Sequence, residues 1–436
     1  MADTITPPTL PPNASMIQMI EALWRLPRDL VSEGYDDALR ALAGQLPMTI
    51  HEYPTGTPCF TWTVPEKWHC REARLETLDG RVLLTSRDNP LHVASYSTPF
   101  RGEITREELL PRLHVHPRLP DAVPFRFFYY TRDWGLCCTQ ALKDSLAEAR
   151  YRVVIDAAFS PGTLKVGEAV LPGQSDDCFV FCAHLCHPAM VNDDLSGVAV
   201  GIDVMRRLAR LPRRRYTYRL VILPETIGSA AYLSHNEALI PTMRGGLFLE
   251  MLGTGHGHVL QKSAPGDSIM DRCAALALRD DGREHAVGDF LTVILNDERM
   301  FNAPGIRVPM ASLSRTLPQG HPEYPFNEYH TSLDCPERLV PGSLEASRDL
   351  VLAIVDMLEY DHVPTPLFKG ELCFSRYGFD YARLKMSLMQ VLFSLDGQTS
   401  AVDIARKTGS PFAVVRECLE GMAAHGLIDK AWPTPV

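Results

Sequence analysis

One stretch of the chain decides the fold: Cys178-Phe-Val-Phe-Cys-Ala-His184-Leu-Cys-His187-Pro-Ala-Met-Val-Asn-Asp193-Asp194-Leu-Ser-Gly197. Its first residues are apolar and rich in phenylalanine and valine, which predicts a buried strand. A helix is predicted from about Leu195 to Leu211, with Asp193 and Asp194 at its start, where acids are favoured. Two histidines and two acids therefore gather where a strand gives way to a helix, as in one half of a metal site.

Two further predicted strands each end in a glutamate: Tyr218–Pro224 leads to Glu225, and Gly246–Leu249 leads to Glu250. In open α/β sheets, functional groups collect beyond the carboxyl ends of the strands. A later Pro-rich loop adds a histidine in Glu328-Tyr-His330-Thr-Ser-Leu-Asp334. Imidazoles and carboxylates suit zinc or a similar divalent ion. The predicted ligands, which with one bridging carboxylate would hold a pair of metals, are His184, Asp193, Glu225, Glu250 and His330.

Simpler interpretations stand beside this one. Asp193 and Asp194 would also serve as helix caps. A Cys/His zinc site is a further alternative, because Cys182, His184 and Cys186 alternate along one strand face, although no matching cysteine pair follows elsewhere. The remaining histidines are expected to be surface or hydrogen-bonded residues rather than ligands: His187, His256 and His321.

The order of these segments resembles the co-catalytic zinc aminopeptidase superfamily, which includes leucyl-type aminopeptidases, glutamate carboxypeptidases and glutaminyl cyclases. More closely, and over nearly the whole chain, the sequence is similar to aminopeptidase-like domain proteins associated with polysaccharide or secondary-metabolite pathways. The motifs that carry the likeness are His184-Leu-Cys-His-Pro, Asn192-Asp-Asp-Leu-Ser-Gly, Pro224-Glu-Thr-Ile-Gly-Ser and Tyr329-His-Thr-Ser-Leu-Asp.

The resemblance implies a ligand scheme and a fold. Asp193 would bridge two zinc ions, with Asp194 shaping the turn beside it. His184 and Glu250 would serve one metal, and Glu225 and His330 the other. The implied fold class is α/β: a zinc-aminopeptidase-like mixed sheet of phosphorylase/hydrolase type with helices on both faces.

Two departures from the resembled peptidases bear on the mechanism. Their first histidine has a nearby acid that orients the imidazole, and Cys186 stands in that place here. They also carry a catalytic glutamate immediately before the ligand glutamate, where this chain has Pro224. Glu225 could leave the ligand set and act as the base over a single metal, and the other candidates for the base are Asp194, Glu298 and Glu323. A metal-free descendant is a further alternative.

The segment Asn296–Pro309 resembles the part of those peptidases that lines the substrate pocket near the last ligand. Arginine is suited to planar anions, so Arg299 and Arg315 are candidates to hold a carboxylate or polarise a carbonyl, together with Tyr324 and Tyr329. In the alternative interpretation, the arginines only pair with Asp297 and Glu298.

Changes in composition and hydrophobic pattern along the sequence predict that the chain has four parts. Residues 1–12 are expected to be a disordered tail, and residues 13–59 and 135–364 the aminopeptidase-like metal domain. Residues 60–134, with short alternating runs broken by turns, among them the aromatic run Phe125–Tyr130, predict an inserted β-rich domain. Its aromatic strands would cover the metal cleft or, in the alternative interpretation, pack in the core of their own sheet. Residues 370–436 carry three predicted helices and a Gly426-Leu-Ile wing, which predicts a winged-helix domain. Its third helix has Arg416 but also Glu417 and Glu420, so a protein-contact or dimerisation module is favoured over DNA binding.

Composition agrees with an enzyme of the cytoplasm. The chain has 436 residues, 45% of them hydrophobic, a net charge of -10 and 11 cysteines without a small-domain disulfide framework. It lacks an 18-residue apolar run and signal-peptide features, and its acidity argues against general nucleic-acid binding. The predicted function is a zinc-dependent amide hydrolase, of aminopeptidase or deacylase type, acting on a small peptide or aminoacyl conjugate. The alternatives are a cyclising or acyl-transfer enzyme of glutaminyl cyclase type and a non-catalytic peptidase-like scaffold that binds partners through the winged helix. Homo-oligomerisation through the C-terminal domain is a separate expectation.

Overall fold

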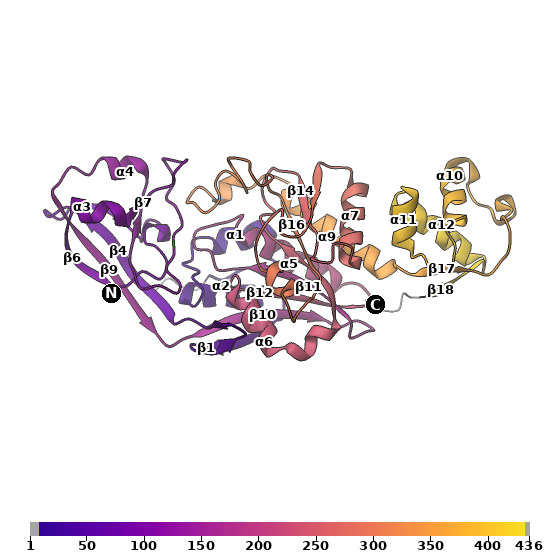
Figure 1. The fold of residues 1–436 in the computed structure, drawn as a ribbon, viewed down its shortest axis with the longest axis horizontal. Helices are drawn as coiled ribbons and strands as arrows, with labels where there is room; N and C mark the ends of the chain where they lie inside the picture. The colour runs from indigo at the N-terminus through magenta and orange to yellow at the C-terminus, as the bar shows by residue number, and fades with distance from the viewer. Residues whose placement is uncertain (1–7, 432–436) are drawn as a thin grey trace.

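The centre of the molecule is an eight-stranded mixed sheet, seen in a computed structural model that describes residues 8–431 (Figure 1). The strand order is β1-β10-β12-β11-β13-β16-β14-β15. The four strands β12, β11, β13 and β16 are mutually parallel, and antiparallel pairings flank them. The strands are β1 (Thr49–Pro54), β10 (Thr163–Leu171), β11 (Cys178–His184), β12 (Thr217–Leu223), β13 (Met243–Leu249), β14 (His258–Gln261), β15 (His285–Gly288) and β16 (Met310–Ser314).

Helices cover both faces of this sheet. The helices of the central part are α1 (Met16–Leu23), α2 (Glu33–Ala43), α5 (Leu195–Leu208), α6 (Ile227–His235), α7 (Ile269–Asp281), α8 (Glu298–Asn302) and α9 (Ser343–Tyr360). Gly201 of α5 packs on Leu220, whose strand partner is Ala169. The Tyr232 hydroxyl of α6 instead reaches Glu168, the neighbour of Ala169, on the opposite face. The predicted mixed α/β sheet is therefore confirmed.

The chain changes direction within the sheet at β11. Helix α5 leads from β11 to β12 on one side, and α6 then carries the chain past β11 to β13 on the other. The carboxyl ends of β11, β12 and β13 consequently meet at one edge, at the position where open α/β sheets bind ligands. All seven residues of β11 are buried, which explains its apolar sequence.

A second, four-stranded antiparallel sheet lies at one end of the molecule, in the order β5-β4-β9-β6 (Figure 1). Strand β9 lies beyond residue 134 in the sequence and runs on into β10 of the central sheet. The predicted aromatic strand Phe125–Tyr130 forms one isolated bridge, between Phe127 and Ser95, and the preceding Pro124 forms another with Thr331. The elements of this part are β2 (Pro58–Cys59), β3 (Trp62–Thr63), β4 (Lys67–Glu76), β5 (Val82–Thr85), β6 (Phe100–Thr105), α3 (Arg106–Leu109), β7 (Leu113–His114), β8 (Leu136–Cys137), α4 (Gln140–Asp144) and β9 (Arg150–Ser160).

The C-terminal part lies at the opposite end (Figure 1). It comprises α10 (Tyr381–Leu392), α11 (Ala401–Thr408) and α12 (Phe412–Ala424), with β17 (Val363–Pro366) paired antiparallel to β18 (Ile428–Ala431). These three helices and one strand pair agree with the predicted elements, but the winged-helix assignment stays a prediction. Short 3-10 helices occur at Pro90–His92, Leu110–Arg112, Glu237–Thr242, Pro336–Arg338 and Phe374–Tyr377.

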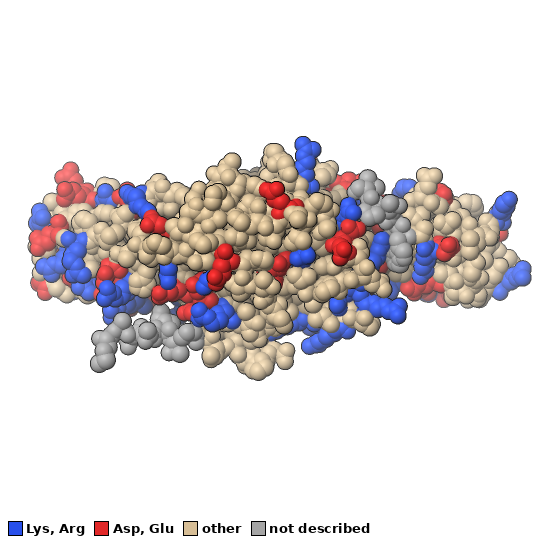
Figure 2. Space-filling model, turned by 90° about the horizontal axis from the view of Figure 1, so that it is seen from below, with Lys and Arg blue, Asp and Glu red and all other residues tan. Residues whose placement is uncertain are grey.

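The surface carries charges of both signs. On the face shown in Figure 2, Lys and Arg side chains are interspersed with Asp and Glu around a largely uncharged centre. Within residues 8–431, no helix combines the length and the apolarity that crossing a bilayer requires. Residues 1–7 of the predicted tail lie outside the described residues.

Candidate metal centre

One carboxylate, that of Asp193, lies between two imidazoles. His184 ends β11, Asp193 precedes α5, and His330 comes from the loop after β16. His184 Nε2 lies 3.1 Å from Asp193 Oδ1, and His330 Nε2 lies 3.0 Å from Asp193 Oδ2. Neither imidazole nitrogen has an aligned hydrogen-bond partner, nor does Asp193 Oδ2, and all three atoms are buried. Unpaired buried polar atoms are costly, so this convergence fits a bound cation.

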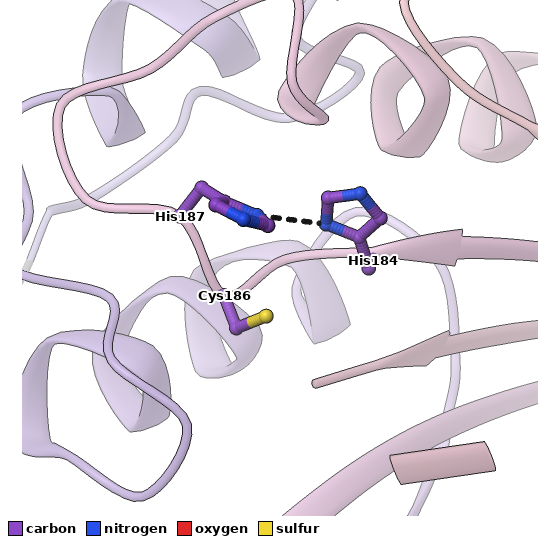
Figure 3. Close-up of side chains that lie close together, drawn as sticks. All are labelled: His184, Cys186 and His187. Carbon is purple, nitrogen blue, oxygen red and sulfur yellow. Dashed lines mark hydrogen bonds between the residues drawn. The ribbon is translucent and has the colours of Figure 1, made fainter. Parts of the chain in front are cut away.

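His187 belongs to the same site, although the sequence predicted a surface or hydrogen-bonded residue at this position. Its side chain is buried, and its Nδ1 is 3.1 Å from His184 Nδ1 (Figure 3). It lies 3.9 Å from Asp193 Oδ1. Two groups of metal-ligand atoms result, each within 4.8 Å: His184, Cys186 and His187, and His187, Asp193 and His330. The signal available in the sequence was the His-x-x-His spacing directly after a buried strand.

The protonation of these groups follows from the carboxylate at their centre. Burial alone would lower the pKa of His184, but Asp193 beside it raises that pKa well above its ordinary value. Burial would likewise raise the pKa of Asp193, yet the surrounding histidines His187, His184 and His330 hold it well below its usual range. Asp193 therefore stays ionised, as a zinc ligand must be. Two or three imidazoles with a carboxylate form an ordinary zinc donor set.

Glu225 lies at the open side of the site, directly after β12. Its side chain is 31% exposed, and its Oε2 is 3.6 Å from His187 Nε2. The backbone N–H of Glu225 donates to Cys186 Sγ at 3.0 Å. Burial raises the pKa of the Cys186 thiol, so a neutral sulfur ties the β11 loop to the β12 loop. Cys186 thus has a defined contact at the position where the resembled peptidases carry an acid.

Glu250 and Asp194 are buried supports around this centre. Glu250 accepts from Asn296 Nδ2 at 2.9 Å and from Ser312 Oγ at 3.1 Å. Asp194 accepts from the backbone of Gly197, Met251 and His184 at 3.1–3.3 Å, and so caps α5. Burial raises the pKa of both carboxyls well above the ordinary value. Among the described residues, neither belongs to the two groups of close metal-ligand atoms.

Asp297 and Glu298 lie behind the Glu225 and Glu250 loops. Asp297 accepts from Thr226 N at 2.8 Å and from the Ser229 hydroxyl, while its Oδ2 is buried without a partner. Glu298 accepts from the Asn296 backbone and from Gln261 Nε2. Burial raises the pKa of each carboxyl to about 7. The carboxylate oxygens of Glu298 and Asp194 are therefore already hydrogen-bonded to nearby N–H donors.

Two charged residues that the sequence interpretation gave no role shape the loop between β11 and α5. Asp334 accepts from the backbone of Val191, Asn192 and Asp193 at 2.9–3.2 Å, which fixes the position of the central carboxylate. Arg28 is fully buried and donates to five backbone carbonyls, those of Leu23, Trp24, Leu185, His187 and Met190. Only the folded chain brings Arg28, from the segment between α1 and α2, to this loop.

The backbone around the site is strained. Positive φ angles occur at Ala189 (51°), Thr226 (61°), Met251 (53°) and His330 (55°), all of them residues other than glycine. Each such conformation costs on the order of 1–3 kcal/mol and persists where the surroundings enforce it. Ala189 is close to His187 in the chain, Thr226 follows Glu225, Met251 follows Glu250, and His330 is itself a candidate ligand. Backbone strain is therefore concentrated where the candidate ligands are held.

The proposed substrate-binding residues occupy different places. Tyr329 stacks on the His330 ring at 3.9 Å, and the Tyr324 hydroxyl donates to Val293 O at 2.5 Å. Arg315 Nη1 is 3.2 Å from His258 Nε2, while Arg299 is exposed and bonds through Nε to Asn296 O. Glu323 is exposed. Tyr329 is therefore the member in contact with the candidate metal centre.

The fold of the chain is found in solved peptidase structures. The chain shares the fold of a zinc aminopeptidase from Bacillus subtilis, with a TM-score of 0.58 at 16% identity over 79% of this chain and 93% of that one. The crystal structure of a "putative peptidase" from Clostridium acetobutylicum is much more similar, with a TM-score of 0.89, 31% identity and coverage of 95% of this chain and 96% of that chain.

The family follows from the sequence comparison. The chain belongs to the family described as "Domain of unknown function (DUF4910)", whose model matches residues 17–361. A curated relative from Clostridium acetobutylicum, named "Putative polysaccharide biosynthesis protein with aminopeptidase-like domain", is 32% identical over 419 residues, which cover 94% of this chain and 95% of the relative. The resemblance to aminopeptidase-like domain proteins is thereby confirmed.

Proposed function

We propose that the protein is a zinc-dependent hydrolase of amide bonds, of aminopeptidase or deacylase type, acting on a small peptide or aminoacyl conjugate. The observation that carries the proposal is the Asp193 carboxylate held between His184 Nε2 and His330 Nε2, with these atoms lacking aligned hydrogen bonds. The name of the Clostridium acetobutylicum relative supports a role in a biosynthetic pathway.

Zinc, as one or two ions, would be held by His184, Asp193 and His330, with His187 as an additional donor. When bound at such a site, zinc polarises a carbonyl and lowers the pKa of water to about 7. Glu225 and Glu250 remain candidate ligands from the sequence pattern. Asp334 and Arg28 position the loop that carries Asp193, so that the donor atoms are preorganised before metal arrives.

Glu225 is the general base in this proposal. Of the candidate bases, Asp194 and Glu298 are buried and already accept nearby N–H groups, whereas Glu225 combines partial exposure with a place beside His187. Its carboxylate would take a proton from the attacking water and return it to the leaving amine. A positioned base contributes typically about 10²–10⁴ in rate.

The test is turnover of zinc-loaded protein on a panel of aminoacyl arylamides and N-acyl amino acids, in water enriched in oxygen-18. We expect hydrolysis with one heavy oxygen in the released acid, and Glu225→Gln should reduce the rate by about 10²–10⁴ while zinc content stays unchanged. Glu237→Gln, an exposed control, should retain full activity. Loss of zinc in Glu225→Gln would identify Glu225 as a ligand instead, and a cyclised product without heavy oxygen would contradict hydrolysis.

A further inference from the structure

We propose that the β-rich part of the chain forms one wall of the metal centre, and that Phe127 in this wall selects substrates with an apolar side chain next to the scissile bond. The inference rests on the proposed function, because it names the side-chain preference of the same site. The wall consists of Phe125, Phe127 and Tyr129 and is called the aromatic wall below.

The segment that carries the aromatic wall is joined by hydrogen bonds to the loop that carries His330. Phe125 N donates to His330 O at 2.8 Å, and Ser332 N donates to Val123 O at 2.9 Å. Val123 N also donates to Ser332 Oγ at 3.0 Å. This pairing fixes the distance between the wall and the imidazole, so the wall and the metal centre form one structural unit.

Phe125, Phe127 and Tyr129, which alternate along the extended segment, form a row of rings that starts at the histidines. The Phe125 ring meets the His187 and His330 rings edge to face, with centroids 5.2 and 5.3 Å away. Phe127 follows at 5.6 Å from Phe125 and stacks on Tyr129 at 4.4 Å. The Tyr129 ring in turn meets the Tyr96 ring edge to face, with centroids 5.3 Å apart. The aromatic wall is therefore a continuous row of rings that begins at the histidine pair.

Exposure distinguishes Phe127 from its neighbours. Phe125 is 6% exposed because it packs in an apolar cluster with Val123, Ala189 and Met190, whereas Phe127 is 50% exposed. Tyr129 covers one side of the Phe127 ring, which leaves apolar surface open one ring further from the histidine pair than Phe125. An apolar group that covers this surface gains roughly 25 cal/mol per Å², and an aromatic pair gains about 0.5–1.5 kcal/mol beyond that. A charged side chain placed there would lose hydration without gaining a partner.

Hydroxamates of single amino acids test the inference, because they bind zinc without being hydrolysed. We would measure the affinities of phenylalanine, glycine and aspartate hydroxamates for the zinc-loaded full chain by calorimetry. The wild type should bind phenylalanine hydroxamate roughly tenfold or more tightly than glycine hydroxamate. Phe127→Ala should reduce this ratio by about 3-fold to 10-fold, with unchanged zinc content and unchanged affinity for glycine hydroxamate.

Two matched variants separate selectivity from a general structural effect. Phe127→Tyr keeps the ring and should keep the wild-type ratio. Phe393→Ala removes an exposed phenylalanine, 74% accessible, from the C-terminal part and should change neither affinity. An unchanged ratio in Phe127→Ala, or tighter binding of aspartate than of phenylalanine hydroxamate, would overturn the inference and leave the proposed function intact. Failure of every hydroxamate to bind the zinc-loaded protein would overturn both.

Discussion

Asp193 determines the chemistry of the candidate centre because its single charge faces three imidazoles. In the absence of a cation, that charge is balanced by protonation of His184, whose pKa Asp193 raises despite burial. Zinc bound by His184 would replace this proton, since an imidazole binds a metal in its neutral form. A buried ionised carboxylate without a cation or a protonated partner would be strongly destabilising.

The change Asp193→Asn keeps the shape of the side chain and removes its charge. We expect zinc content per chain, measured by elemental analysis, to fall to the level of chelator-treated protein. The thermal stabilisation by added zinc should disappear as well, since a ligand at about 100 times its Kd stabilises the native state by about 2.7 kcal/mol. Asp203→Asn, at a partly exposed ion pair on α5, is the control and should retain zinc. Full zinc retention by Asp193→Asn would contradict the central role of this carboxylate.

Strand-end reasoning explains which site residues the sequence could indicate. It selects His184 at the end of β11 and Asp193 at the start of the helix that follows, and the structure brings both together with His330 from a later loop. The same reasoning also selects Glu225 and Glu250, which among the described residues lie outside the two groups of close metal-ligand atoms. It gives no account of Arg28 or Phe125, which reach the site only through tertiary contacts with segments more than 60 residues away in the chain. The local sequence pattern predicts strands and helices through their periodicity, but it does not predict how one loop packs on another.

At the scale of elements, Glu168 connects four pieces of the central sheet layer. From β10 it accepts from Arg219 of β12 at 2.6 Å and from the Tyr232 hydroxyl of α6 at 2.6 Å, and it lies 2.8 Å from His51 Nε2 of β1. Burial alone would raise the pKa of Glu168, but the hydrogen bonds from His51, Tyr232 and Arg219 hold it at about 2. The network secures the antiparallel strands beside the parallel core.

This network predicts an acid-dependent loss of stability. A carboxyl pKa lowered from 4.5 to about 2 on folding contributes roughly 3 kcal/mol. The contribution is complete above pH 4.5 and is lost as the pH falls toward 2. Glu168→Gln should therefore lower the free energy of urea unfolding by roughly 3 kcal/mol at pH 7, with a difference from wild type that shrinks below pH 4.5. Glu52→Gln, exposed on β1, should have little effect. An equal loss at pH 7 and near pH 2.5 would refute this origin.

Element prediction succeeded where periodicity alone decides the structure. The predicted strand at Cys178–His184 and the start of the helix at Leu195 agree with β11 and α5, although the helix ends at Leu208 rather than Leu211. The run Phe125–Tyr130 has strand composition but only an isolated bridge, because its backbone partners are a loop and a turn rather than a strand. Strand composition therefore predicts an extended backbone but does not identify its hydrogen-bond partner.

At the scale of the whole molecule, the arginine of the third C-terminal helix, Arg416, faces the central part of the chain. Arg416 of α12 bonds both oxygens of Asp356 on α9 at 2.8–2.9 Å and Glu420 at 3.1 Å, and it lies over the Tyr360 ring. Its guanidinium is thus engaged within the chain. The net charge of -10 adds long-range repulsion toward a polyanion.

We therefore expect the protein not to bind duplex DNA through α12. A short fluorescein-labelled duplex should show no change in anisotropy on titration with protein at about 50 mM salt, conditions that favour phosphate contacts. A basic DNA-binding domain is the positive control. Binding that weakened steeply with salt and was lost in Arg416→Ala would contradict this expectation. Because Arg416 bridges α12 and α9, that variant should instead loosen the C-terminal part, seen as faster amide exchange in α12 and β18 than in β11.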